Sequence, residues 1–229
     1  MKFNILVGLF VVALCNLCGC GGGGGGSDGT PTAQGTTVNL SAFKNVYLGT
    51  SAGTQYSFPA LFGSDSQGRS WSGSFSIVGD GATTFESQDV TKQRSLITLQ
   101  MAGGTPVSGT TTAYFLSSNG NPYKSVSSLG VTFTPTSLFT IPSTAKVGDF
   151  GDLGTDSGSD GTTTTGTWTL NAGNNGASIL AFSSLTKTGT LVTSTEVDSI
   201  YLDASGNPTM LAISVTASGL TVNLSGAKN

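Results

Sequence analysis

Apolar and polar residues alternate along three segments of this chain, 72–78, 95–101 and 220–224. In each segment hydrophobic residues recur at every second position, and Gly, Asp, Asn or Pro residues lie at the boundaries. A period of two over four to eight residues predicts β-strands with one buried face. Beyond the N-terminal signal described below, no window shows the 3.6-residue stripe of an amphipathic helix. The pattern therefore predicts an all-β protein.

Two stretches have the sequence of a β-hairpin. In each, aromatic and branched residues lead into a turn that contains Gly-Asn-Pro, and a second strand-like segment follows. The glycine supplies the positive φ that tight turns require. The first hairpin is predicted to join 114–116 to 123–126, and the second to join 200–202 to 209–213.

Short sequence markers recur in the same order in two parts of the chain, which indicates an internal duplication. We expect related halves at about 37–131 and 132–220, with a final strand at 220–225. Two repeats are too few for a solenoid, so the halves are expected to form one antiparallel β-sandwich or barrel, a single domain at 37–229. Because Thr37-Val38-Asn39-Leu40 is repeated as Thr221-Val222-Asn223-Leu224, the first and last strands are expected to occupy equivalent places. The other markers are 63–66 with 154–157, 69–72 with 166–169, and 115–122 with 201–208.

The N-terminus has the pattern of a secretory signal, with Lys2 followed by an apolar run at 3–14 that is too short for a transmembrane helix. It ends in Leu17-Cys18-Gly19-Cys20, which resembles the lipobox of bacterial lipoproteins. The resemblance implies cleavage of residues 1–19, lipidation of Cys20 and acylation of the new amine. Several acyl chains hold a protein on a membrane almost permanently. The alternative is an ordinary cleaved signal whose Cys residues are incidental.

A run of six glycines at 21–26 follows Cys20, and the next residues are also small or polar. We interpret residues 20–36 as a lipidated Cys and a flexible tether, because no apolar side chain here can offset the entropy of ordering. Cys15 and Cys18 would leave with the signal, so the mature chain would have no free thiol and no disulfide. Gly21 stands where Asp would mark inner-membrane retention in enteric bacteria, so the resemblance favours the outer membrane and leaves open which side the protein faces.

Composition excludes several classes of chemistry. The chain has 229 residues, no His, 9 Lys and Arg, and 12 Asp and Glu. Without His it can build neither a Ser-His-Asp triad nor a His-ligated metal site. With so few basic residues, we expect no nucleic-acid partner.

The densest acidic stretch contains Asp149, Asp152, Asp156 and Asp160. Such oxygen-rich loops can bind Ca²⁺. The stretch departs from the EF-hand pattern, however, and long turns select the same residue types. It is a weak calcium candidate, and we expect no metal and no cofactor other than the lipid on Cys20.

Trp71 and Trp168 are the two tryptophans and lie at matching places in the halves. If they were exposed, they could stack on sugars. A Trp in an alternating strand more often packs in the core. A carboxylate hydrolase would need two carboxyls across a cleft. Glu86 and Glu196 are the only glutamates, with Asp198 and Asp203 near the second, and exposed strand carboxylates commonly keep sheet edges soluble.

We therefore expect no catalytic residues and no enzyme. The expected function is that of a membrane-anchored envelope lipoprotein whose non-catalytic β-module is a structural or interaction element. The chain resembles the small envelope lipoproteins of Gram-negative bacteria in its lipobox and Gly-rich tether, which implies location and no activity. The alternatives are a surface module that binds a polysaccharide or a protein and, less favoured, a small carboxylate-based hydrolase.

Overall fold

A computed structural model of the protein describes residues 33–137 and 141–229. Apart from one short helix, the regular elements are all strands. The elements are β1 (Thr37–Asn39), α2 (Ser41–Tyr47), β2 (Gln55–Asp65), β3 (Ser70–Phe85), β4 (Gln88–Met101), β5 (Val107–Leu116), β6 (Pro122–Ser127), β7 (Thr132–Pro135), β8 (Thr144–Lys146), β9 (Phe150–Gly158), β10 (Thr162–Ala172), β11 (Ser178–Thr188), β12 (Leu191–Leu202), β13 (Pro208–Ala217) and β14 (Leu220–Ala227).

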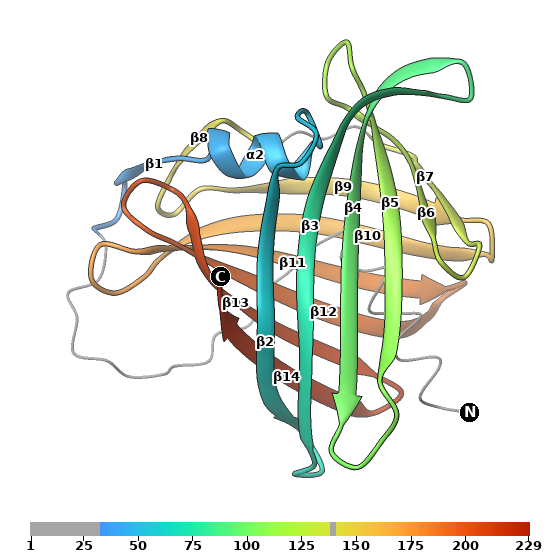
Figure 1. Ribbon diagram of the computed structural model, residues 1–229, viewed down its shortest axis with the longest axis vertical. Coiled ribbons are helices and arrows are strands. Elements are labelled where there is room, and N and C mark those ends of the chain that lie inside the picture. The colour runs from blue at the N-terminus through green and yellow to red at the C-terminus, as the bar shows by residue number, and fades with distance from the viewer. Residues whose placement is uncertain (1–32, 138–140) are drawn as a thin grey trace.

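Twelve of the strands form a closed antiparallel barrel (Figure 1). The order around the ring is β10-β11-β12-β13-β14-β2-β3-β4-β5-β6-β7-β9, and β9 pairs with β10 to close it. Most neighbours in this ring are consecutive in sequence, and β14 with β2 and β7 with β9 provide the long-range joins. The expected all-β fold is confirmed, and of the two expected architectures the barrel is present. Closure leaves the ring without a free sheet edge.

Side chains alternate between the inside and the outside of this wall. On β3, for example, Trp71, Phe75 and Ile77 are buried, whereas Ser74 and Ser76 between them are partly exposed. Most of the buried hydrophobic residues form one cluster inside the barrel. The interior is therefore a packed core, and the outer face is rich in hydroxyl side chains.

The helix α2 is a departure from the sequence expectation, which placed no helix in this region. It spans only seven residues, too few to show a clear helical stripe. Its buried residues Phe43, Val46 and Tyr47 follow the i, i+3, i+4 spacing of one helix face. Ring contacts join Phe43 and Tyr47 to Phe182 on β11, so α2 packs against the barrel interior at one end (Figure 1).

The first strand also departs from expectation. β1 lies outside the ring and pairs with β8, whereas β14 lies in the ring between β13 and β2. The similar sequences at 37–40 and 221–224 therefore do not occupy equivalent places. Just before β1, Gly35 donates its N–H to the Val147 carbonyl, and Thr36 accepts the N–H of Val147. The internal duplication itself stays a prediction.

Both predicted hairpins are present, as β5–β6 and β12–β13. Their turn glycines, Gly120 and Gly206, have φ of 72° and 82°, in the left-handed region that favours glycine. A Cβ on Gly206 would also lie 1.8 Å from the Asn39 carbonyl oxygen. The second turn therefore needs glycine both for its backbone conformation and for its close approach to β1.

Candidate functional site

The inward side chains of three adjacent strands change from apolar to polar along their length. On β11, Leu180 and Phe182 are followed by Ser184 and Thr186. We call these two parts of the wall the apolar section and the polar section. The apolar section also contains Leu170 and Trp168 of β10 and Leu202 and Ile200 of β12; the polar section also contains Thr164 of β10, Asp198, Glu196 and Ser194 of β12, and Asp156 of β9.

Glu196 and Asp198 are the most unusual residues of the polar section. They lie two residues apart on β12 and are 2% and 1% exposed. Glu196 is paired across the sheet with Val215 and Asp198 with Ile213, and both of these neighbours belong to the core. The two carboxyl groups therefore point into the barrel. The expectation that they are exposed strand carboxylates is wrong.

No hydrogen bond satisfies the oxygens of these two carboxyl groups within the part of the chain that the structure describes. The same holds for the buried hydroxyls of Ser184 and Ser194. Ser184 lies directly across from Glu196 on β11, and Ser194 precedes Glu196 by two residues on β12. Six buried oxygens on neighbouring inward positions thus lack a partner.

Burial controls the protonation of the pair. It raises the pKa of Asp198 to about 8. Burial also raises the pKa of Glu196 well above its ordinary value, and the neighbouring charge of Asp198 raises it further. Two like charges side by side in a low-dielectric interior repel each other, so the two carboxyl groups hold at least one proton at neutral pH.

Two other inward carboxyl groups show what decides whether the pKa of a buried carboxyl group rises or falls. Burial raises the pKa of Asp156 to about 7. Burial also acts on Asp65, but its carboxylate accepts hydrogen bonds from the Trp71 indole and from the Arg69 side chain and backbone, and its pKa falls to about 2. A buried carboxylate with N–H donors stays charged, whereas no N–H group of the described residues donates to Glu196 or Asp198.

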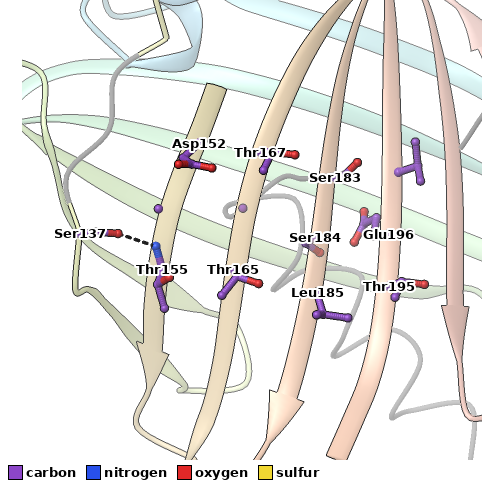
Figure 2. A pocket seen from close by; sticks show the side chains of 13 residues that line it. Ser137, Asp152, Thr155, Thr165, Thr167, Ser183, Ser184, Leu185, Thr195 and Glu196 are labelled. Atoms are coloured by element: carbon purple, nitrogen blue, oxygen red, sulfur yellow. Dashed lines mark hydrogen bonds between the residues drawn. The ribbon is translucent and has the colours of Figure 1, made fainter. Parts of the chain in front are cut away.

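The outer face of β9–β12 carries a shallow groove of about 730 Å³ (Figure 2). We call it the outer groove. Asp152, Thr165, Thr167 and Thr195 in its lining are exposed, while the residues that alternate with them point inward. Ser184 and Glu196 also contribute to the lining, so the buried carboxyl pair lies directly behind the floor of the groove.

A second hollow of about 480 Å³ lies on the outer face of β12–β14 and β2. It shares Val197 with the outer groove. Phe62, on its rim, is 64% exposed, and Tyr201 also lines it. The outer face of this side of the barrel therefore offers a polar hollow beside one with aromatic side chains.

The four aspartates of the weak calcium candidate do not converge. Asp149 accepts the Lys146 N–H, and Asp160 accepts hydrogen bonds from Thr162 in the β9–β10 turn. Asp152 lies on the outer face, whereas Asp156 points inward. In the described part of the chain, no group of three or more His, Cys, Asp or Glu side chains is placed to hold a metal ion.

The two tryptophans both point into the barrel. Trp71 is 3% exposed and donates its indole N–H to Asp65 at 2.9 Å. Trp168 is 7% exposed and lies against Gly151, where a Cβ would come within 2.8 Å of the indole nitrogen. Neither indole presents a face to the surface, so a stacking platform for sugars is not formed by these residues.

The remaining carboxylates of the hydrolase alternative have local roles. Glu86 accepts hydrogen bonds from Tyr123 and Lys124, which lower its pKa. Asp203 caps the β12–β13 turn through the N–H groups of Ser205 and Asn207, and these bonds lower its pKa. Glu86 thus joins the β3–β4 turn to β6, and Asp203 stabilises its own turn.

Cys20 and the predicted signal lie outside the described residues. Among the residues that are described, no helix is long and apolar enough to cross a membrane. Comparisons of the chain with models of protein families, with curated proteins and with solved structures found no match. The function therefore has to be inferred from the residues and the geometry of the barrel.

Proposed function

We propose that the chain is a lipid-anchored envelope protein whose barrel is a non-catalytic interaction module, with the outer groove as its contact surface. The observation that carries the proposal is the groove itself, a hollow of about 730 Å³ on the outer face of the wall. Hydroxyl groups of Thr165, Thr167 and Thr195 and backbone groups of the wall line it. Such groups bind a polar partner, such as a polysaccharide or a protein segment, by hydrogen bonds.

The polarity of the barrel supports attachment to a membrane by a lipid. Barrels that span a membrane present an apolar outward band and a polar interior. Here large apolar residues such as Phe58, Leu99 and Phe182 are inside, and hydroxyl residues such as Thr165, Thr167 and Thr195 are exposed outside. Lipidation of Cys20 at the predicted lipobox would then provide the anchor, and the Gly-rich segment would separate the barrel from the lipid surface.

The carboxylates of the groove favour binding over hydrolysis. A glycosidase places two carboxyl groups on either side of the bond that it cleaves. Asp152 is the exposed carboxylate among the residues that line the groove, and the Glu196 side chain is 2% exposed. This arrangement supports the interaction module over the hydrolase.

A crosslinking experiment in intact cells tests the contact surface. If Cys20 is lipidated, a cysteine introduced into the chain provides the one free thiol of the mature protein. Thr195→Cys places a thiol in the outer groove, and Ser108→Cys places one on exposed β5, across the ring. After labelling with a benzophenone maleimide and irradiation, we expect a discrete adduct for Thr195→Cys that is absent for Ser108→Cys. Equal adducts at both positions, or none, would contradict the proposal.

The anchor has a separate test. Cells grown with labelled palmitate should incorporate the label into the wild-type chain, and the chain should sediment with membranes. Cys20→Ser should abolish both, and Cys18→Ser is the matched control because Cys18 would leave with the signal. Retention of label in Cys20→Ser would refute the anchor without bearing on the groove.

A further inference from the structure

We propose that the outer groove and the second hollow form one continuous binding track for a single extended chain of an uncharged polysaccharide. The inference rests on the proposed function, because it uses the outer groove as a contact surface, and it adds the class of ligand and the course that the ligand follows. The groove lies on β9–β12 and the hollow on β12–β14 and β2, and Val197 lines both. A ligand that occupies both therefore crosses seven neighbouring strands of the ring.

An aromatic ring stands at each end of one row of outward side chains that crosses these strands. In this row each residue is the direct cross-strand partner of the next, from Phe62 on β2 to Phe150 on β9. Six inter-strand spacings of about 4.8 Å make the row about 29 Å long. The residues between the two rings are small, so the surface between the rings is low. They are Ser225, Ala212, Ser199, Ala181 and Thr169.

Both rings at the ends of this row are largely exposed: Phe62 is 64% and Phe150 is 78% exposed. The face of a phenyl ring carries partial negative charge, and the C–H groups on the face of a pyranose ring carry partial positive charge, so the two stack. The other large hydrophobic residues that are exposed in the described chain, Leu129, Leu191 and Val192, are aliphatic and lie in a turn or at a strand end. The exposed rings therefore favour this row as a surface for sugar rings.

A second row of outward residues, next to the first, provides polar groups along the floor of both hollows. Its members repeat at the inter-strand spacing of about 4.8 Å, which is similar to the length of one pyranose unit in an extended chain. Ser183 in the outer groove is 2% exposed, and no hydrogen bond joins its hydroxyl to another residue that the structure describes. A sugar hydroxyl would supply this partner. The hydroxyl and amide groups of the row belong to Ser64, Asn223, Ser214, Ser183 and Thr167.

The charges along the track favour an uncharged polymer. No Lys or Arg is among the described residues that line either hollow, and Asp152 is the exposed carboxylate among them. An anionic polysaccharide would therefore meet a negative charge and no positive one, whereas an uncharged polysaccharide needs neither.

The pairing of the strands favours a polysaccharide over an extended protein segment. Protein segments commonly bind a sheet by adding a strand to a free edge. Each of β10–β14 is paired on both sides, so these strands offer no free edge. Their outer face presents side chains, and hydroxyl groups beside exposed rings fit the hydroxyls and the flat C–H faces of sugars.

Native gels that contain hydroxyethyl cellulose, laminarin or galactomannan test the track, with the purified full chain in a non-ionic detergent that has no sugar head group. We expect at least one of these three uncharged polysaccharides to retard the wild-type chain, and alginate, which is anionic, to leave its mobility unchanged. Phe62→Ala and Phe150→Ala should each raise the dissociation constant for the retarding polysaccharide about tenfold, because each removes a stacking surface. Both side chains are exposed, so the variants should fold.

Leu129→Ala is the matched control. Leu129 is 65% exposed, nearly the same as Phe62, but it lies in the β6–β7 turn outside the track, so this variant should bind like the wild type. The inference is overturned if none of the three uncharged polysaccharides retards the wild-type chain, or if Leu129→Ala weakens binding as much as Phe62→Ala. A crosslinked adduct of Thr195→Cys with a polypeptide, together with no retardation, would overturn the polysaccharide and keep the outer groove as a contact surface.

Discussion

The apolar and polar sections of the wall share strands β10–β12, their register and the same interior, but they affect stability in opposite directions. In the apolar section, Phe182 packs against the aromatic rings of α2. In the polar section, Glu196 and Asp198 are equally buried and have no hydrogen-bond partner among the described residues. Well-packed apolar residues in place of buried charges are often neutral or stabilising. The comparison separates a part of the wall that stabilises the fold from one whose buried carboxyl groups oppose folding when they ionise.

The largest expected effect of a single substitution lies in the apolar section. Phe182 is fully buried and contacts both Phe43 and Tyr47. Phe182→Ala should lower the free energy of unfolding by about 3–5 kcal/mol, because it removes a large apolar side chain and leaves a cavity. Urea denaturation monitored by the fluorescence of the two buried tryptophans measures the loss.

The control for this substitution lies on the same strand. Leu185 points outward and is partly exposed, so Leu185→Ala should cost about 1 kcal/mol or less. Equal losses at the two positions would show that burial inside the barrel does not set the cost of the substitution, and the distinction between inward and outward faces would fail.

The second effect has the opposite sign and comes from the polar section. The Glu196→Gln/Asp198→Asn double variant should be more stable than the wild type by about 1–4 kcal/mol at pH 8. The wild type must ionise buried carboxyl groups as the pH rises, whereas the amides carry no charge. At pH 4 the two proteins should have nearly equal free energies of unfolding.

The sign follows from the direction of the pKa shifts. The folded state holds the protons of Glu196 and Asp198 more tightly than the unfolded state, because burial raises both pKa values, that of Asp198 to about 8. Folding stability therefore falls as the pH rises from about 4 to about 8. The adjacent inward residues of β11 and β13, which are Phe182, Ser184, Ile213 and Val215, carry no group that titrates in this range.

A residual dependence on pH should remain in the double variant. Asp156 also points inward, and burial raises its pKa to about 7. Its contribution is common to both proteins and ends near pH 7, so above pH 7 the stability of the double variant should be nearly constant while that of the wild type still falls toward pH 8. Urea denaturation at closely spaced pH values measures the slopes. A double variant with the full slope of the wild type would place the titrating groups elsewhere.

The strands and both hairpins could be predicted from sequence because period-two alternation and turn glycines are local signals. Closure of the ring could not, since it depends on the pairing of β14 with β2 and of β9 with β7 and β10. The helix α2 was missed because seven residues are too few to show a stripe and tertiary packing of Phe43 and Tyr47 stabilises it.

The carboxyl pair did leave a signal in the sequence. Glu196, Asp198, Ile200 and Leu202 are alternate residues of β12. Alternate residues of a strand point to the same side, so all four lie on the inward face. Carboxylates are seldom buried without a partner, so the residue type favours an outward side chain. The alternation with Ile200 and Leu202 favours an inward one. The structure follows the alternation. A conflict of this kind between residue preference and fold is expected at functional positions.

The smallest expected effect tests whether the polar section as a whole, or only its carboxyl pair, is unfavourable. Thr164 and Thr186 face each other across β10 and β11, and their hydroxyls form a buried hydrogen bond of 3.1 Å. Thr164→Val or Thr186→Val alone should cost about 1–2 kcal/mol, because each leaves one buried hydroxyl without its partner. The double variant should return close to the stability of the wild type, because both hydroxyls are removed together. A double-mutant cycle by urea denaturation measures the coupling. Additive losses would mean that the two hydroxyls are satisfied independently, and the contrast between the partnered threonines and the unpartnered carboxyl pair would then lose its basis.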